Sequence, residues 1–231
     1  MEIVRQTLLG MHLVAGALAL GLFWVPALTR KGSALHRSAG RWYTAAMAII
    51  TVTGFGLAAL FLAGERWRTG VFLLFLGVIT GTSLWNGWRV LRVKRAPQAY
   101  AGRMHVAVAL ANVLGGTALI AFGLWVKAPL FYAFGPVGLV IGGNMLHFAL
   151  RGSNDPLFWR AEHLTGMIGS GIASHVAFLA FGGSRLFGWG TTGYGLILWI
   201  APLVIGTVAI AVLNIQHQRR FAASTPAVVT A

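Results

Sequence analysis

Long apolar segments alternate with short polar and basic stretches along the 231 residues of this chain. A transmembrane helix needs about 20 consecutive, predominantly apolar residues. Segments of that kind lie at roughly 6–28, 43–64, 70–91, 104–126, 129–150, 160–182 and 190–214. The pattern predicts an all-α integral membrane protein, a bundle of about seven transmembrane helices that forms one domain over 1–214, with residues 215–231 as a short cytoplasmic tail.

The first apolar segment has the features of a span rather than of a cleaved signal peptide. Its apolar run is longer than a signal-peptide core of about 7–15 residues. The acidic Glu2 precedes it, and no small-residue cleavage site follows a short core. We therefore expect this segment to be the first transmembrane helix.

Composition supports a bilayer environment and narrows the possible chemistry. Apolar residues make up 57% of the chain and charged residues 10%, whereas a soluble domain carries about 25% charged residues. The 31 glycines favour close packing between helices. Cysteine is absent, which excludes disulfides, thiolate metal ligands and a cysteine nucleophile.

The net charge of +14 would suggest nucleic acid as the partner of a soluble protein. Here the basic residues lie in short loops, where they set membrane orientation instead. Thirteen of them fall on one side: Arg30, Lys31, Arg37, Arg41, Arg89, Arg92, Lys94, Arg95, Arg103, Arg151, Arg160, Arg219 and Arg220. The other side carries five: Arg5, Arg66, Arg68, Lys127 and Arg185. The richer side is expected in the cytoplasm, which puts the N-terminus outside and the C-terminus inside.

Three short stretches resemble one another, and each opens a predicted span. They are AGRWYTAAMAI (39–49), AGRMHVAVALA (101–111) and RAEHLTGMIGS (160–170). Their alignment puts Tyr43, His105 and His163 at equivalent positions. The chain is therefore compatible with three related helical hairpins plus a terminal helix.

The histidines fall at two levels of the predicted membrane. His12 and His175 both lie roughly 10 Å below the outer surface, at a rise of about 1.5 Å per residue. His105, His147 and His163 share the cytoplasmic level, and His36 lies in the adjacent loop. His217 belongs to the tail and is expected to be solvated.

Ionisable residues within spans usually mark functional sites, and imidazole is a common ligand of haem iron. The leading interpretation is therefore a histidine-ligated cofactor, haem b, in a transmembrane electron carrier or oxidoreductase. We expect His12 and His175 as the outer axial pair, and His105 with His163 or His147 as the inner one. A quinone or another redox partner would exchange electrons with these centres.

The spacing of two histidines limits this interpretation. His163 and His175 are twelve residues apart, so they point about 120° apart around a regular helix and share one seam only if that helix is kinked. At the inner level, Glu162 and Arg37 are expected to meet haem propionates or protons.

Other functions remain open. His105, His147, His163 and Glu162 are the candidate ligands of a zinc hydrolase, with His36, Glu162 or Asp155 as its general base. No HExxH spacing supports that alternative. A transporter would use Asn112 and Asn144 to line a polar path. Each of these side chains also has a structural interpretation, as a hydrogen bond between helices.

The loop RKGSALHRSAGRWY (30–43) carries the pattern K-G-x-x-x-H-R-x-x-G-R-x-Y. The matching residues are Lys31, Gly32, His36, Arg37, Gly40, Arg41 and Tyr43, and His12 in the preceding span also fits. The pattern resembles the hallmark of a family of bacterial multi-spanning membrane proteins of unknown function. The resemblance implies a multi-pass protein of the bacterial inner (plasma) membrane and implies no activity. The similarity weakens beyond the fourth span.

Overall fold

The structure is a computed structural model that describes residues 2–188 and 195–224. Its long helices are α1 (Glu2–Leu28), α2 (Ala34–Leu62), α3 (Trp67–Arg89), α5 (Arg103–Trp125), α6 (Pro129–Arg151), α7 (Phe158–Ala177) and α9 (Gly195–Ser224). Shorter elements are η1 (Val90–Arg92), α4 (Pro97–Tyr100), η2 (Phe178–Gly183) and α8 (Ser184–Phe187). Within these described ranges, seven helices are long and apolar enough to cross a membrane, which confirms the predicted all-α, multi-pass fold.

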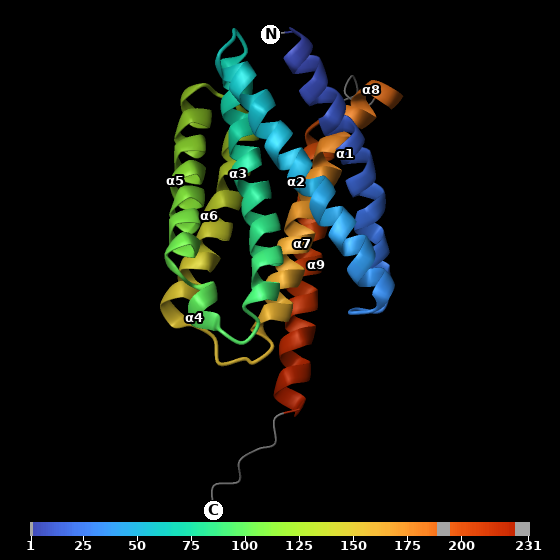
Figure 1. The fold of residues 1–231 in the computed structure, drawn as a ribbon. Helices are drawn as coiled ribbons and strands as arrows, with labels where there is room; N and C mark the ends of the chain where they lie inside the picture. The colour runs from blue at the N-terminus through green and yellow to red at the C-terminus, as the bar shows by residue number, and fades with distance from the viewer. Residues whose placement is uncertain (1, 189–194, 225–231) are drawn as a thin grey trace, which may run out of the picture.

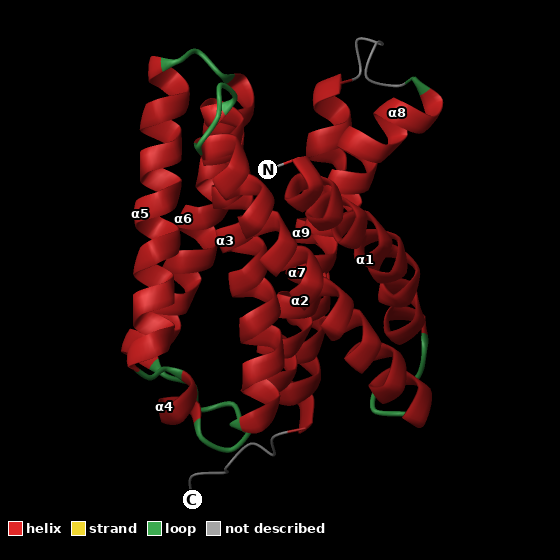
Figure 2. Ribbon diagram, turned by 45° about the horizontal axis from the view of Figure 1, so that its top comes forward, coloured by secondary structure: helices red, strands yellow, loops and turns green. Residues whose placement is uncertain are grey.

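The helices form a bundle with α3 and α7 at its centre (Figure 1; Figure 2). The hairpin of α1 and α2 packs on one side, and the hairpin of α5 and α6 packs on the other. Helix α3 contacts α2, α5, α6 and α7, and α7 also contacts α1 and α9. Each of the three similar stretches lies at the start of a helix that packs on the next long helix of the chain. The pairs are α2 with α3, α5 with α6, and α7 with α9.

Glycines bring the backbones of neighbouring helices close together, as the composition suggested. A Cβ atom added to Gly166 of α7 would lie 2.5 Å from the backbone nitrogen of Gly87 in α3. The same construction at Gly142 of α6 would meet the carbonyl oxygen of Ala109 in α5 at 2.5 Å. Small residues allow such approaches between helices that share a bilayer.

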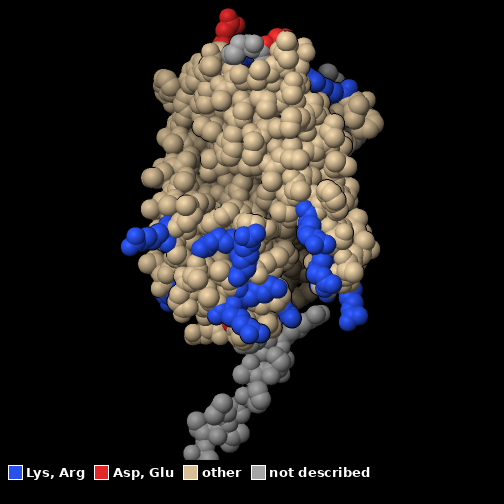
Figure 3. Space-filling view, viewed as in Figure 1, with Lys and Arg blue, Asp and Glu red and all other residues tan. Residues whose placement is uncertain are grey.

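Lys and Arg side chains gather at one end of the bundle, which we call the basic end (Figure 3). It comprises the α1–α2 turn, the segment from η1 to the start of α5, and the α6–α7 loop. The N-terminus lies at the opposite end (Figure 1). The division of the loops into a basic and a less basic side therefore matches the folded bundle.

Orientation in the membrane is testable with single cysteines, because the chain has none of its own. Gln98 is exposed at the basic end, and Glu65 is exposed between α2 and α3 at the opposite end. We expect Glu65→Cys to react with an impermeant maleimide in intact cells with a permeable outer envelope. Gln98→Cys should react only after the inner membrane is opened. The reverse pattern would overturn the orientation that the basic loops predict.

The C-terminal segment departs from the sequence prediction. Helix α9 continues to Ser224, ten residues beyond the predicted end of the last span. Asn214 Nδ2 donates to Thr165 Oγ1 at 3.0 Å, and His217 Nε2 lies 3.2 Å from Asp155 Oδ2. The expectation of a merely solvated His217 was therefore wrong, because α9 packs along α7 and brings this histidine to the α6–α7 loop.

Candidate functional site

The α1–α2 turn is closed by side chains of the K-G-x-x-x-H-R pattern. The ammonium of Lys31 donates to the carbonyl oxygens of Pro26 at 2.8 Å and Ala27 at 2.6 Å. These carbonyls are at the end of α1, where the helix itself offers no donor. Gly32 adopts a φ of +79°, a left-handed conformation that favours glycine. Burial lowers the pKa of the Lys31 ammonium.

Two more residues of the pattern fix the start of α2. The backbone N–H of His36 donates to Ser33 Oγ at 3.1 Å, which caps the helix. The ring of His36 donates through Nδ1 to the Pro26 carbonyl at 3.1 Å. The guanidinium of Arg37 donates to the carbonyl of Gly32. The turn is thereby held with the His36 ring in one orientation.

His163 of α7 lies close to this turn. Its Nδ1 donates to the carbonyl oxygen of Gly87 in α3 at 2.8 Å. It is also within electrostatic reach of His36, Lys31 and Lys94. The surface at the basic end is hollowed between groups of basic side chains (Figure 3). The structure therefore brings His36 and His163, from α2 and α7, to the same region.

A second polar group surrounds Tyr100, which is fully buried. Its hydroxyl donates to Glu162 Oε2 at 2.9 Å. Arg89 donates to the carbonyl oxygens of Tyr100 and, at 2.6 Å, of Ala99. Burial, followed by the Glu162 carboxylate, raises the pKa of Tyr100, so its hydroxyl remains a donor. Glu162 thus accepts from Tyr100, and neither salt bridge among the described residues includes Glu162 or Arg37.

His105 packs against the same tyrosine, with ring centroids 4.7 Å apart. Its Nε2 donates to the carbonyl oxygen of Met145 in α6 at 3.2 Å, and its buried Nδ1 has no partner among the described residues. His147, only two positions beyond Met145, is exposed on the outer face of α6. The inner pairings of His105 with His163 or His147 are therefore not formed.

The alternative zinc ligands do not converge either. His105 bonds the backbone of α6, His163 bonds the backbone of α3, and Glu162 bonds Tyr100. Within the described ranges, no group of three His, Cys, Asp or Glu side chains is placed to hold a metal ion. Asp155, a candidate general base, accepts from the backbone N–H of Leu157 at 2.7 Å at the start of α7.

The proposed outer pair, His12 and His175, is also not brought together. Nδ1 of His12 lies 2.9 Å from Thr53 Oγ1 in α2. His175 packs edge-on against Phe23 and Trp24 of α1, with ring centroids 5.1 and 5.6 Å apart. Since Phe23 follows His12 by eleven residues on one helix, about 16 Å of rise separates the two levels.

Two local features explain this error. After α7, the chain continues through η2 and α8, so His175 lies well inside a longer apolar element. In addition, His163 and His175 lie on one continuous α-helix, α7, which runs from Phe158 to Ala177. His163 contacts α3 and His175 contacts α1, which agrees with the separation of about 120° that twelve residues give around a helix.

The asparagines of the transporter alternative do not form a path. Asn112 is buried, and its Nδ2 donates to Thr82 Oγ1 in α3 at 2.8 Å. Asn144 is exposed on α6. Asn112 therefore connects α5 to α3, as a helix-packing residue does.

The tautomers of His36 and His163 fit a ligand-binding role. A backbone carbonyl accepts only from an N–H, so Nδ1 carries the proton in both rings. Nε2 then carries the lone pair, which is the tautomer that a hydrogen bond from Nδ1–H to a backbone carbonyl imposes on ligating histidines. From the sequence, His36 was a candidate general base, ligand or proton carrier in the loop, and it was not paired with His163, because the sequence does not show that this loop lies close to α7.

No protein-family model, curated protein sequence or solved structure matches this chain. The family suggested by the pattern at 31–43 stays a prediction. Arg89 and Tyr100 were missed by the sequence reasoning, although they connect α3, α4 and α7. Arg89 had been counted only as an orientation charge, and Tyr100 lies in a four-residue helix too short to show periodicity.

Proposed function

We propose that this protein binds one b-type haem at the basic end, with His36 of α2 and His163 of α7 as axial ligands. The observation that carries the proposal is that both rings have the same tautomer, with the proton on Nδ1. Each donates Nδ1–H to a backbone carbonyl, at 3.1 and 2.8 Å, neither Nε2 has a hydrogen-bond partner among the described residues, and His36 is within electrostatic reach of His163. Bis-imidazole ligation of haem iron needs two such nitrogens from different helices.

The surrounding charge suits an anionic cofactor. Lys31 lies within electrostatic reach of His163 and retains one donor after its two bonds to the end of α1. A haem carries two propionates, for which a lysine at the membrane surface is a suitable partner. Glu162 is already bonded to Tyr100 and is left out of this set.

A haem at this place would make the protein a one-electron carrier. When bound, the haem would supply one-electron chemistry, with a membrane-soluble donor such as a quinol and an acceptor at the basic end as the redox partners. We place that end in the cytoplasm and the protein in a bacterial inner membrane, from the loop charges and the pattern at 31–43. One centre replaces the two that the sequence suggested.

The absorption spectrum of the purified protein in mild detergent, before and after dithionite, tests the proposal. We expect a Soret band that sharpens on reduction, with separate α and β bands. His36→Ala and His163→Ala should each abolish the low-spin spectrum. His147→Ala, at an exposed histidine of α6, is the matched control and should keep it.

His163→Gly with added imidazole separates ligation from folding. Imidazole should restore the low-spin bands in that variant, because it replaces the missing ligand and not the helix contact. A colourless wild-type protein, expressed with adequate haem supply, would overturn the proposal. Full haem occupancy in the His163→Ala variant would overturn the ligand assignment.

A further inference from the structure

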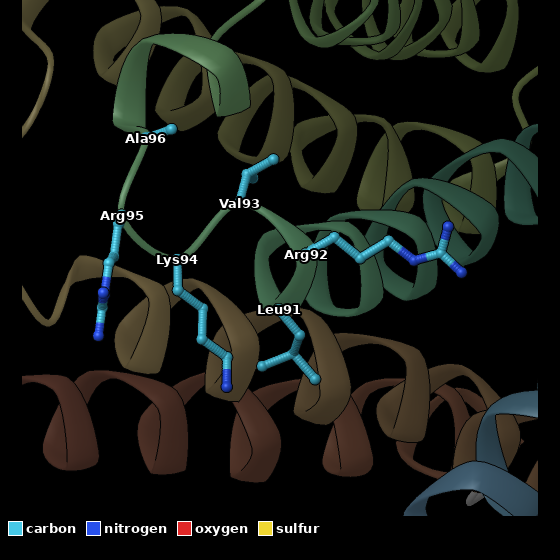
Figure 4. A pocket seen from close by; sticks show the side chains of 6 residues that line it. All are labelled: Leu91, Arg92, Val93, Lys94, Arg95 and Ala96. Carbon is cyan, nitrogen blue, oxygen red and sulfur yellow. The ribbon is translucent and has the colours of Figure 1, made fainter.

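A shallow cavity of about 380 Å³ opens at the basic end, beside the segment that joins η1 to α4. It is lined by Leu91, Arg92, Val93, Lys94, Arg95 and Ala96 (Figure 4). The side chains of Lys94 and Arg95 extend in the same direction, and Leu91 lies on the same side of the segment (Figure 4). Arg92 extends along the surface in another direction. The cavity thus combines two neighbouring cations with an apolar wall.

The cations of this cavity lack an acidic partner among the described residues. Arg92, Lys94 and Arg95 are exposed, and neither salt bridge of the described chain includes them. The chain has only four acids. Glu2 pairs with Arg5, Asp155 bonds His217, Glu162 bonds Tyr100, and Glu65 lies at the opposite end. Three neighbouring positive charges without a counter-charge repel one another and favour an anion between them.

Tryptophans indicate the depth of these cations. The guanidinium of Arg92 lies 3.8 Å from the centroid of the Trp88 ring, and Lys94 Nζ lies 4.4 Å from that of Trp159. Trp88 is 40% exposed at the end of α3. Tryptophans at the ends of transmembrane helices lie at the level of lipid head groups. The cations therefore lie where a phospholipid places its phosphate.

We propose that this cavity binds the head group of an anionic phospholipid. Lys94 and Arg95 would contact the phosphate, and Leu91 would contact the glycerol and the first acyl carbons. Val93 extends to the other side of the segment and packs against the cluster of Val90, Tyr100 and Phe158. Basic pockets beside transmembrane helices bind such lipids through this combination of charge and apolar surface. Arg92 contributes to the local charge and not to the same phosphate, because it points elsewhere. The proposal does not require a haem to be bound, although Lys94 is also within electrostatic reach of His163.

Thermal unfolding of the full-length protein in detergent, with added lipid, tests this site. At about ten times the dissociation constant, phosphatidylglycerol is expected to raise the unfolding midpoint by about 3–6 °C. Phosphatidylcholine should give no comparable shift. The double variant Lys94→Gln/Arg95→Gln should lose the phosphatidylglycerol effect, and Arg92→Gln should keep most of it.

The matched control is Arg66→Gln/Arg68→Gln, which removes the same charge from exposed residues at the opposite end. This variant should respond to phosphatidylglycerol as the wild type does. Equal responses to both lipids, or equal loss in both double variants, would overturn the proposal. An equal shift with inorganic phosphate alone would assign the cavity to a free anion and overturn the lipid as its ligand.

Discussion

Replacing Gly166 with valine is expected to prevent formation of the folded bundle. A Cβ atom at Gly166 would lie 2.5 Å from the nitrogen and 2.6 Å from the Cα of Gly87, and 2.6 Å from the carbonyl oxygen of Ser83. All three are backbone atoms of α3, so no side-chain rotation relieves the overlap. Overpacking of an ordinary core costs about 1–3 kcal/mol, and here two central helices must separate. We expect a loss of at least about 3 kcal/mol.

The measurement is the yield of monodisperse protein in mild detergent, followed by thermal unfolding of what is recovered. Gly143→Val in α6 is the matched control, because Gly143 is exposed and a Cβ there meets nothing within 4 Å. That substitution should change stability by less than about 0.5 kcal/mol. If Gly166→Val unfolded at the wild-type temperature, the close crossing of α3 and α7 would be wrong.

Replacing Tyr100 with alanine is expected to destabilise the basic end by about 3–5 kcal/mol, the usual cost of removing a buried aromatic ring. The ring is fully buried and packs with Val90 and Phe158, in contact with Phe148 and His105. The substitution also removes the hydroxyl that donates to Glu162. Unfolding in detergent, compared with the wild type, measures the loss.

A graded series separates packing from hydrogen bonding. Tyr100→Phe keeps the ring and leaves the Glu162 carboxylate without its donor, which should cost about 1–3 kcal/mol. Tyr132→Phe, at a tyrosine that is 38% exposed, should have no measurable effect. The effects of Tyr100→Phe and Glu162→Leu should be strongly non-additive, because both break the same contact. Additive effects would show that the bond between Tyr100 and Glu162 contributes nothing.

Helix locations followed from local sequence patterns. In a bilayer, a segment must satisfy its own backbone hydrogen bonds, so about 20 apolar residues are enough to define a helix without knowledge of its neighbours. The predicted span 129–150 corresponds to α6 (Pro129–Arg151), and 104–126 corresponds to α5 (Arg103–Trp125). The uneven loop charges likewise identified the end at which Lys and Arg gather.

The histidine partners did not follow from the sequence. The pairing of His12 with His175 assumed that both helices begin at the same level, but His175 lies beside Phe23 and Trp24, far along α1. The inner pairings assumed that residues at one depth face one another, but His147 points away from the bundle. Depth is only one of the coordinates of a side chain on a helix. Rotation about the axis and the identity of the neighbouring helix are the others.

By itself, the sequence determined the helical class, the seven spans and the basic end, because the hydropathy and charge of each segment decide whether that segment lies in lipid or in water. Only the tertiary structure decided that α3 packs on α7 and that His36 lies near His163. It also revealed the bond between Tyr100 and Glu162, which are 62 residues apart. Such contacts depend on close approaches between helices, such as that of Gly87 to Gly166. The sequence of one segment does not predict how its surface fits the surface of a distant segment.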